Sequence, residues 1–181
     1  MAQPHALGAE VASMPSYVVD DFAVVYARHY RRLVVTLCLS GASLETAEEI
    51  TQEAFLRAFS SWTRVRLGSN PPGYLYRTSF RLWRRRRRRD ARSSLGTQST
   101  PPFSDPASEA TTRVALQRAF AALPPKTRTC AALALHSGLD TVEIARILHI
   151  KPATVRVHVH NARSALRAAL AEAPDPHDDT A

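Results

Sequence analysis

"DTVEIARILHIKPATVR", residues 140–156, sets the fold of the last third of this 181-residue chain. Asp140 and Glu143 have the spacing of a capping box, in which each side chain satisfies the backbone N–H of the other residue, so a short helix is expected to begin here. Pro152 suits the first position of a following helix, where its missing N–H costs nothing. A short helix, a three-residue turn and a longer basic helix together predict a helix-turn-helix, whose second helix can enter the major groove of DNA.

Both sides of this motif carry the residue types that the interpretation needs. The core positions are apolar: Ile144, Ala145, Leu148, Ile150 and Val155. The outward positions carry residues that can contact base edges and phosphates, namely Lys151, Thr154, Arg156, His160 and Arg163. A plain helical hairpin with a solvated basic face is the alternative. Capping, spacing and charge agree with one another, so DNA binding is favoured.

A second basic block lies upstream, in "RLWRRRRRRD" (81–90). Residues 77–92 carry nine arginines and one aspartate, a net charge of +8. Aromatic residues followed by cations suit DNA that is being melted, because rings stack on unpaired bases while arginines hold phosphates. Tyr76, Phe80 and Trp83, however, recur at helical spacing and are expected in the core. The arginine run surrounds a helix, so about half of it can face one duplex; nonspecific affinity for polyanions is the alternative.

The N-terminal half shows three helical patterns. The first begins at the acidic pair Asp20–Asp21 and has apolar residues three and four positions apart. Ser43 can cap the second, "LETAEEITQEAFLRAFSSW" (44–62), which has an apolar stripe on one side and acidic residues on the other. A turn-rich loop, "RVRLGSNPP" (64–72), is expected before a third helix that starts at Gly73 and runs into the arginines.

These patterns predict an all-α chain with two small helical domains. In the second domain we expect a helix over 111–122, a break at Pro124–Pro125, a helix that stops near Gly138, and the last helix over 152–170. The expected order is a disordered leader (1–18), an N-terminal helical domain (19–92), a flexible linker rich in Ser, Thr and Pro (93–110), a C-terminal helical domain (111–171) and a disordered acidic tail (172–181).

Other functional classes find no support in the residue pattern. Cys38 and Cys130 lie far apart in apolar runs, as is typical of reduced core thiols in a cytoplasmic protein. His158 and His160 diverge on a helix, so neither a metal nor a cofactor is expected. A signal-peptide pattern and a run of about 18 apolar residues are both missing, so no membrane insertion is expected. No carboxylate cluster suits metal-dependent nuclease chemistry, and the chain is not expected to be an enzyme.

Three segments, in this order, resemble the extracytoplasmic-function (ECF) sigma factors of bacterial RNA polymerase, in the sigma-70 superfamily. They are "AEEITQEAFLRAF" (47–59), "GYLYRTSFRLWRRRRRR" (73–89) and "ALPPKTRTCAALALHSGLDTVEIARILHIKPATVRVHVHNARSALR" (122–167). The resemblance covers residues 20–171. The chain departs from the family pattern at Tyr74, Arg81, His149 and Ala153, where the family usually has Trp, Asn, Gly and Gly.

The resemblance implies a division of labour, with sigma region 2 in residues 19–92 and sigma region 4 in 111–171. The acidic helix would dock on the clamp helices of the polymerase's largest subunit, through Glu48, Glu49, Gln52 and Glu53. The third helix and the loop before it would read and open the minus-ten element, through Arg64, Arg66, Ser69, Asn70, Arg77, Arg81, Arg84, Arg85 and Arg88. The helix-turn-helix would read the minus-thirty-five element through the outward residues named above.

The implied function is that of a non-catalytic initiation subunit. Its implied partners are core RNA polymerase and promoter DNA, with an anti-sigma factor as a potential third. The alternative is a self-sufficient helix-turn-helix transcription regulator. Such a regulator needs no polymerase-docking surface, so it leaves the acidic helix unexplained.

Overall fold

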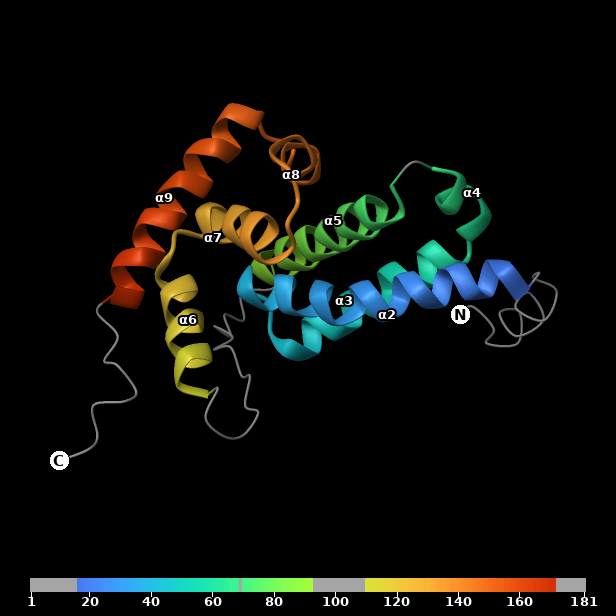
Figure 1. Cartoon of the computed structure of the whole chain (residues 1–181), viewed down its shortest axis with the longest axis horizontal. Coiled ribbons are helices and arrows are strands. Elements are labelled where there is room, and N and C mark those ends of the chain that lie inside the picture. The colour runs from blue at the N-terminus through green and yellow to red at the C-terminus, as the bar shows by residue number, and fades with distance from the viewer. Residues whose placement is uncertain (1–15, 69, 93–109, 172–181) are drawn as a thin grey trace.

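The structure is a computed structural model that describes residues 16–68, 70–92 and 110–171. Every regular element in these ranges is helical, which confirms the predicted all-α class (Figure 1). The predicted linker, apart from Ala110, and the predicted acidic tail lie outside the described residues, as does most of the predicted leader. Within the described ranges, no helix combines the length and the apolar character needed to cross a membrane.

The N-terminal half contains four helices: α2 (Ser16–Leu39), α3 (Leu44–Phe59), α4 (Trp62–Leu67) and α5 (Pro71–Arg92). Helix α2 begins at Ser16, four residues before the predicted acidic start, so the prediction of a leader through residue 18 was wrong at its end. Ser43 caps α3 as predicted, because its side chain accepts a hydrogen bond from the N–H of Thr46 at 3.2 Å.

The predicted loop over 64–72 is wrong, because residues 62–67 form the short helix α4. Trp62 and Val65 lie one turn apart on it, and both are buried against Phe22 on α2 and Tyr74 on α5. Burial of Trp62 and Val65 stabilises this six-residue helix. The glycine and prolines that follow it in the sequence suggest a loop instead. Helix α5 then starts at Pro71, two residues before the predicted Gly73.

The C-terminal half contains α6 (Ala110–Ala122), α7 (Pro125–Ala131), a π-helical turn η1 (Ala132–His136), α8 (Thr141–Leu148) and α9 (Pro152–Ala171). The capping box is present: the Asp140 side chain accepts from the N–H of Glu143 at 2.7 Å, and Glu143 accepts from the N–H of Asp140 at 3.2 Å. Pro152 is the first residue of α9, as the sequence predicts.

The two halves pack against each other, which the sequence does not predict. Helix α8 lies on α5 (Figure 1), and η1 contacts α2. One buried apolar cluster contains Leu75 and Phe80 from α5 together with Ile144 and Ile147 from α8. Buried polar contacts join the halves as well, since the hydroxyls of Thr36 and Ser137 lie 2.7 Å apart. In this structure the two predicted domains therefore share a core.

Candidate nucleic-acid and protein interfaces

The helix-turn-helix is assembled as predicted. Ile144 and Val155 are fully buried between α8 and α9, and Ala145 is buried beside them. His149 adopts the left-handed conformation, with φ 55° and ψ 49°, and its N–H bonds to the carbonyl of Ala145. Glycine is the usual residue in this conformation at a helix C-terminus. The departure at His149 thus leaves the turn in place and puts a strained residue in it.

Helix α9 buries one stripe and exposes the rest. Its buried residues are Val155, Ala162 and Leu166. All five predicted contact residues are exposed on the motif: Lys151, Thr154, Arg156, His160 and Arg163. The exposed side of the second helix therefore has the polar and basic character that reading a major groove requires.

The acidic face of α3 is exposed over its predicted length. Glu48, Glu49, Gln52 and Glu53 all reach the surface. Glu53 pairs with Arg57 one turn further on, and the Gln52 amide lies 3.4 Å from the Tyr30 hydroxyl. Burial, and to a lesser degree the charge of Glu48, raises the pKa of the nearby Cys38 thiol to about 11. This face could attract a basic protein surface and would repel nucleic acid.

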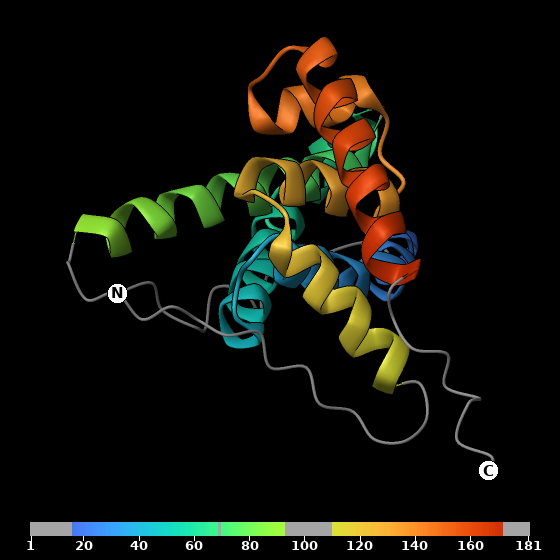
Figure 2. The same ribbon diagram turned by 90° about the vertical axis from the view of Figure 1, so that its left-hand side faces the viewer.

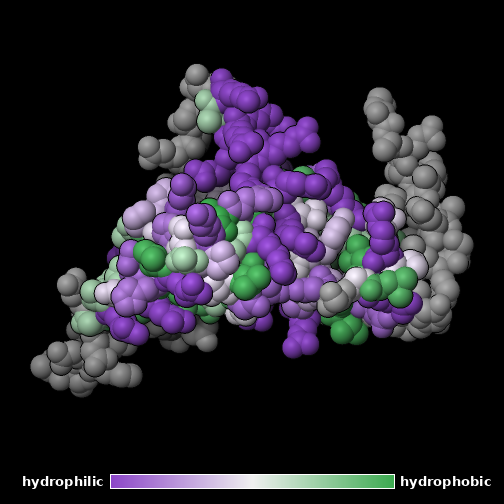
Figure 3. Space-filling model, turned by 90° about the horizontal axis from the view of Figure 1, so that it is seen from above, coloured by the Kyte–Doolittle hydropathy of each residue, from purple (hydrophilic) through white to green (hydrophobic). Residues whose placement is uncertain are grey.

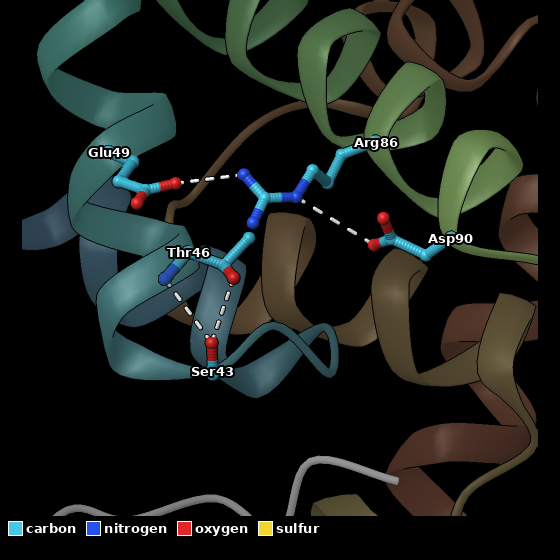
Figure 4. A network of polar contacts seen from close by, with 5 residues as sticks. All are labelled: Ser43, Thr46, Glu49, Arg86 and Asp90. Carbon is cyan, nitrogen blue, oxygen red and sulfur yellow. Dashed lines mark hydrogen bonds and ion pairs between the residues drawn. The ribbon is translucent and has the colours of Figure 1, made fainter. Parts of the chain in front are cut away.

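Glu49 on this acidic face forms an ion pair with the arginine run (Figure 4). Arg86 Nη1 on α5 donates to Glu49 Oε2 at 2.9 Å, and Arg86 Nε lies 3.8 Å from Asp90 Oδ2. In the close-up the guanidinium lies between the two carboxylates, one from α3 and one from its own helix. The sequence prediction did not include Arg86 or Asp90 in any site.

The arginine run forms the free end of α5, which stands out from the body (Figure 2). The three aromatics before it are buried as predicted, with Tyr76 at 1%, Phe80 at 0% and Trp83 at 5% exposure, so they do not present open faces to unpaired bases. Arg87 stacks over the exposed edge of this core, 5.1 Å from the Trp83 ring centre. The rest of the run is hydrophilic surface, and the face seen from above mixes such side chains with scattered apolar ones (Figure 3).

The structure spreads the predicted minus-ten residues over different environments. Those exposed on the run and on the helices before it are Arg64, Arg77, Arg81, Arg85 and Arg88. Arg66 instead pairs with Asp21 at 3.0 Å, and Ser69 lies outside the described residues. Only part of the predicted set is therefore exposed and outside the ion pairs described above.

Two of the predicted minus-ten residues contact the C-terminal half. The Asn70 amide donates to Glu143 Oε1 at 2.5 Å, and its own oxygen accepts from the N–H of Gly73. Arg84 Nη1 lies 3.5 Å from the carbonyl of Leu148. Burial, followed by repulsion from Arg88, lowers the pKa of Arg84. The Asn70–Glu143 contact borders a cavity of about 320 Å³ that is lined by residues of α4, α5 and α8. Sequence reasoning missed this cavity because it depends on the packing of the two halves.

Among the described residues, no group of three or more His, Cys, Asp or Glu side chains is arranged to hold a metal ion. The candidate interfaces are instead one acidic surface and two basic ones. A larger cavity of about 740 Å³ lies between α2 and α6. It is lined by apolar side chains such as Val35 and Phe120 and by arginines such as Arg28 and Arg128.

Comparison with known proteins gives matches to both halves of the chain. The family model of sigma-70 region 2 matches residues 25–93, and that of sigma-70 region 4 matches residues 113–166. The ECF RNA polymerase sigma factor SigE of Mycolicibacterium smegmatis is 32% identical over 170 residues, which cover 89% of this chain and 64% of SigE. This chain therefore spans slightly less than two thirds of that relative.

A second relative is matched over more of its length. The ECF RNA polymerase sigma factor EcfG of Rhodopseudomonas palustris is 30% identical over 138 residues, or 74% of this chain and 76% of EcfG. Among solved structures, the sigma factor RpoE in complex with the anti-sigma factor NepR, from Bartonella quintana, has a similar fold. The TM-score is 0.69 at 21% identity, over 85% of this chain and 99% of RpoE.

Proposed function

Because this chain belongs to the family of ECF RNA polymerase sigma factors, we propose that it binds core RNA polymerase and directs it to promoter DNA. The acidic face of α3 docks on the polymerase, α5 and the residues before it engage the minus-ten element, and α9 reads the minus-thirty-five element. The chain acts as a DNA-binding initiation factor and supplies no catalytic group.

The observation that supports this proposal is the presence of oppositely charged exposed surfaces on one chain. Glu48, Glu49 and Glu53 face solvent on α3, whereas Arg156 and Arg163 face solvent on α9. A regulator that acts by binding DNA alone requires only the basic surface of α9. A polymerase subunit has a use for both, because it must hold a protein and a nucleic acid at the same time.

The docking surface is tested by reversing its charge. In Glu49→Lys/Glu53→Lys, two attractive charges become repulsive, and co-purification with core polymerase should be strongly reduced while far-UV circular dichroism stays helical. Arg118→Glu, which reverses an exposed charge on α6, is the matched control and should co-purify like the wild type. Transcription from the cognate promoter should fall in parallel with co-purification. If the double variant bound core polymerase as the wild type does, α3 would not be the docking surface.

A further inference from the structure

The ion pair between Glu49 and Arg86 joins two surfaces that the proposed function uses for different partners. Glu49 belongs to the acidic face of α3, and Arg86 stands in the middle of the arginine run. The two charged groups meet at 2.9 Å across the packed pair of helices (Figure 4). Neither group is withdrawn from solvent, since the Arg86 side chain is 38% exposed and that of Glu49 is 52% exposed.

We propose that this pair is a latch: in the free chain Glu49 holds Arg86 away from nucleic acid, and a basic protein surface that takes Glu49 releases Arg86 to a phosphate. The inference rests on the proposed function in one respect, namely that the basic surface belongs to core polymerase. The latch itself is a property of the chain alone.

The position of the pair on a fixed scaffold supports this role. Helices α3 and α5 share the core that contains Ala54 and Phe80, so their backbones do not have to move for the pair to break. Rotation of one long side chain is sufficient. The Asp90 carboxylate, at 3.8 Å, lies on the same helix as Arg86 and therefore does not tie it to α3.

The weakness of an exposed ion pair is what allows it to be exchanged. Such a pair changes an equilibrium by at most about fivefold, and less at high salt. A partner that presents several basic groups to α3 can therefore displace Arg86 at little cost. Because binding equilibria are reciprocal, DNA that takes Arg86 should in turn favour the binding of the basic partner to Glu49.

The latch is tested first without polymerase, on the full-length chain and a duplex of scrambled sequence. Binding is measured over a range of salt concentrations for four proteins: wild type, Arg86→Gln, Glu49→Gln, and the double variant. In the wild-type background, Arg86→Gln should flatten the slope of log affinity against log salt by clearly less than about 0.9, because Glu49 competes with the phosphate for Arg86. In the Glu49→Gln background, it should flatten that slope by about 0.9, the value for one phosphate contact.

A matched variant separates the latch from the general effect of removing a negative charge. Glu45→Gln removes an exposed carboxylate from the same helix that makes no ion pair with Arg86 in the structure. In the Glu45→Gln background, Arg86→Gln should change the slope of log affinity against log salt by the same amount as in the wild-type background. At low salt, Glu49→Gln should bind the duplex more tightly than Glu45→Gln, by up to about fivefold.

Two results of this cycle overturn the latch. An equal slope change in the wild-type and Glu49→Gln backgrounds would show that Arg86 reaches DNA while Glu49 is present. No slope change in either background would show that Arg86 does not reach DNA at all.

A second measurement adds core polymerase and cognate promoter DNA. Arg86→Gln should now flatten the salt slope of holoenzyme–promoter binding by about 0.9 with Glu49 intact. If core polymerase does not bind, the proposed function fails, and the result without polymerase still decides on the latch. If core polymerase binds but Arg86→Gln has no effect on that slope, polymerase does not release Arg86 and the inference is wrong.

Discussion

At the scale of single residues, His149 in the turn of the helix-turn-helix has a strained backbone conformation. His149 has φ 55° and ψ 49°, and its side chain is exposed. A residue with a Cβ atom in this conformation is strained by about 1–2 kcal/mol, whereas glycine is not. Glycine in turn loses more conformational freedom on folding, by about 0.5–1 kcal/mol. The strain therefore outweighs the entropy by a small margin.

We accordingly expect His149→Gly to raise the free energy of unfolding by about 0.5–1 kcal/mol, as measured by urea denaturation. Little packing is lost, because the imidazole is on the surface. His160→Gly, in the middle of α9, is the matched control and should lower the stability by about 0.3–0.5 kcal/mol, the difference between the helix propensities of His and Gly. A destabilised His149→Gly variant would show that the imidazole makes a contact that compensates for the strain.

At the scale of elements, local signals in the sequence predicted where most helices begin and end. The Ser43 cap, the Asp140–Glu143 capping box and Pro152 act through neighbouring backbone groups, so they can be read without the rest of the chain. Helix α4 could not be predicted in this way. Its stability depends on burying Trp62 against residues from α2 and α5, which are distant in sequence.

The basic surface of α5 was predictable to a similar extent. Helical spacing correctly placed Tyr76, Phe80 and Trp83 in the core and left the arginines after them on the surface. The sequence could not show which arginines are already engaged. Arg86 is paired with a carboxylate from α3, and Arg84 contacts a carbonyl of α8, because of how other helices pack on α5.

The arginines at the end of α5 that make no such contact give a prediction. Arg85, Arg88 and Arg89 are exposed there. If each one contacts a phosphate, replacing all three by Gln should flatten the log–log salt dependence of nonspecific DNA binding by about 2.7, at about 0.9 for each contact. The ratio of promoter to nonspecific affinity should be retained, because phosphate contacts carry no sequence information. A slope equal to that of the wild type would show that the end of α5 is solvated surface.

At the scale of the whole molecule, the closed packing of the two halves limits how the chain can lie on a promoter. Helix α8 contacts α5 directly, and Asn70 is hydrogen-bonded to Glu143 on α8. Residues 93–109, 17 in all, connect α5 to α6 and can extend to at most about 56 Å. That length equals roughly 16 base pairs at 3.4 Å each. The connection is therefore long enough for α5 and α9 to occupy separate promoter elements once the halves part.

Ile147 is the residue through which this packing can be tested without damage to the helix-turn-helix. It is only 2% exposed, and it lines the cavity between the halves together with Tyr74 and Arg77. An ammonium group buried at this position would lose its hydration and be repelled by Arg64, Arg77 and Arg146, so Ile147→Lys should favour the open arrangement. The radius of gyration from small-angle X-ray scattering should increase, while far-UV circular dichroism should remain that of a helical protein.

Val142→Lys is the control for this substitution, because Val142 is on the same helix but 46% exposed. The radius of gyration of the control variant should match that of the wild type. Opening frees Asn70 from Glu143 and uncovers the face of α5 beneath α8. The free Ile147→Lys chain should therefore bind promoter DNA more tightly than the Val142→Lys control, which carries the same added charge, as measured by fluorescence anisotropy. If scattering showed the expansion but DNA affinity did not rise, the closed packing would not be what restrains DNA binding; if neither changed, the two halves would not be held together through Ile147.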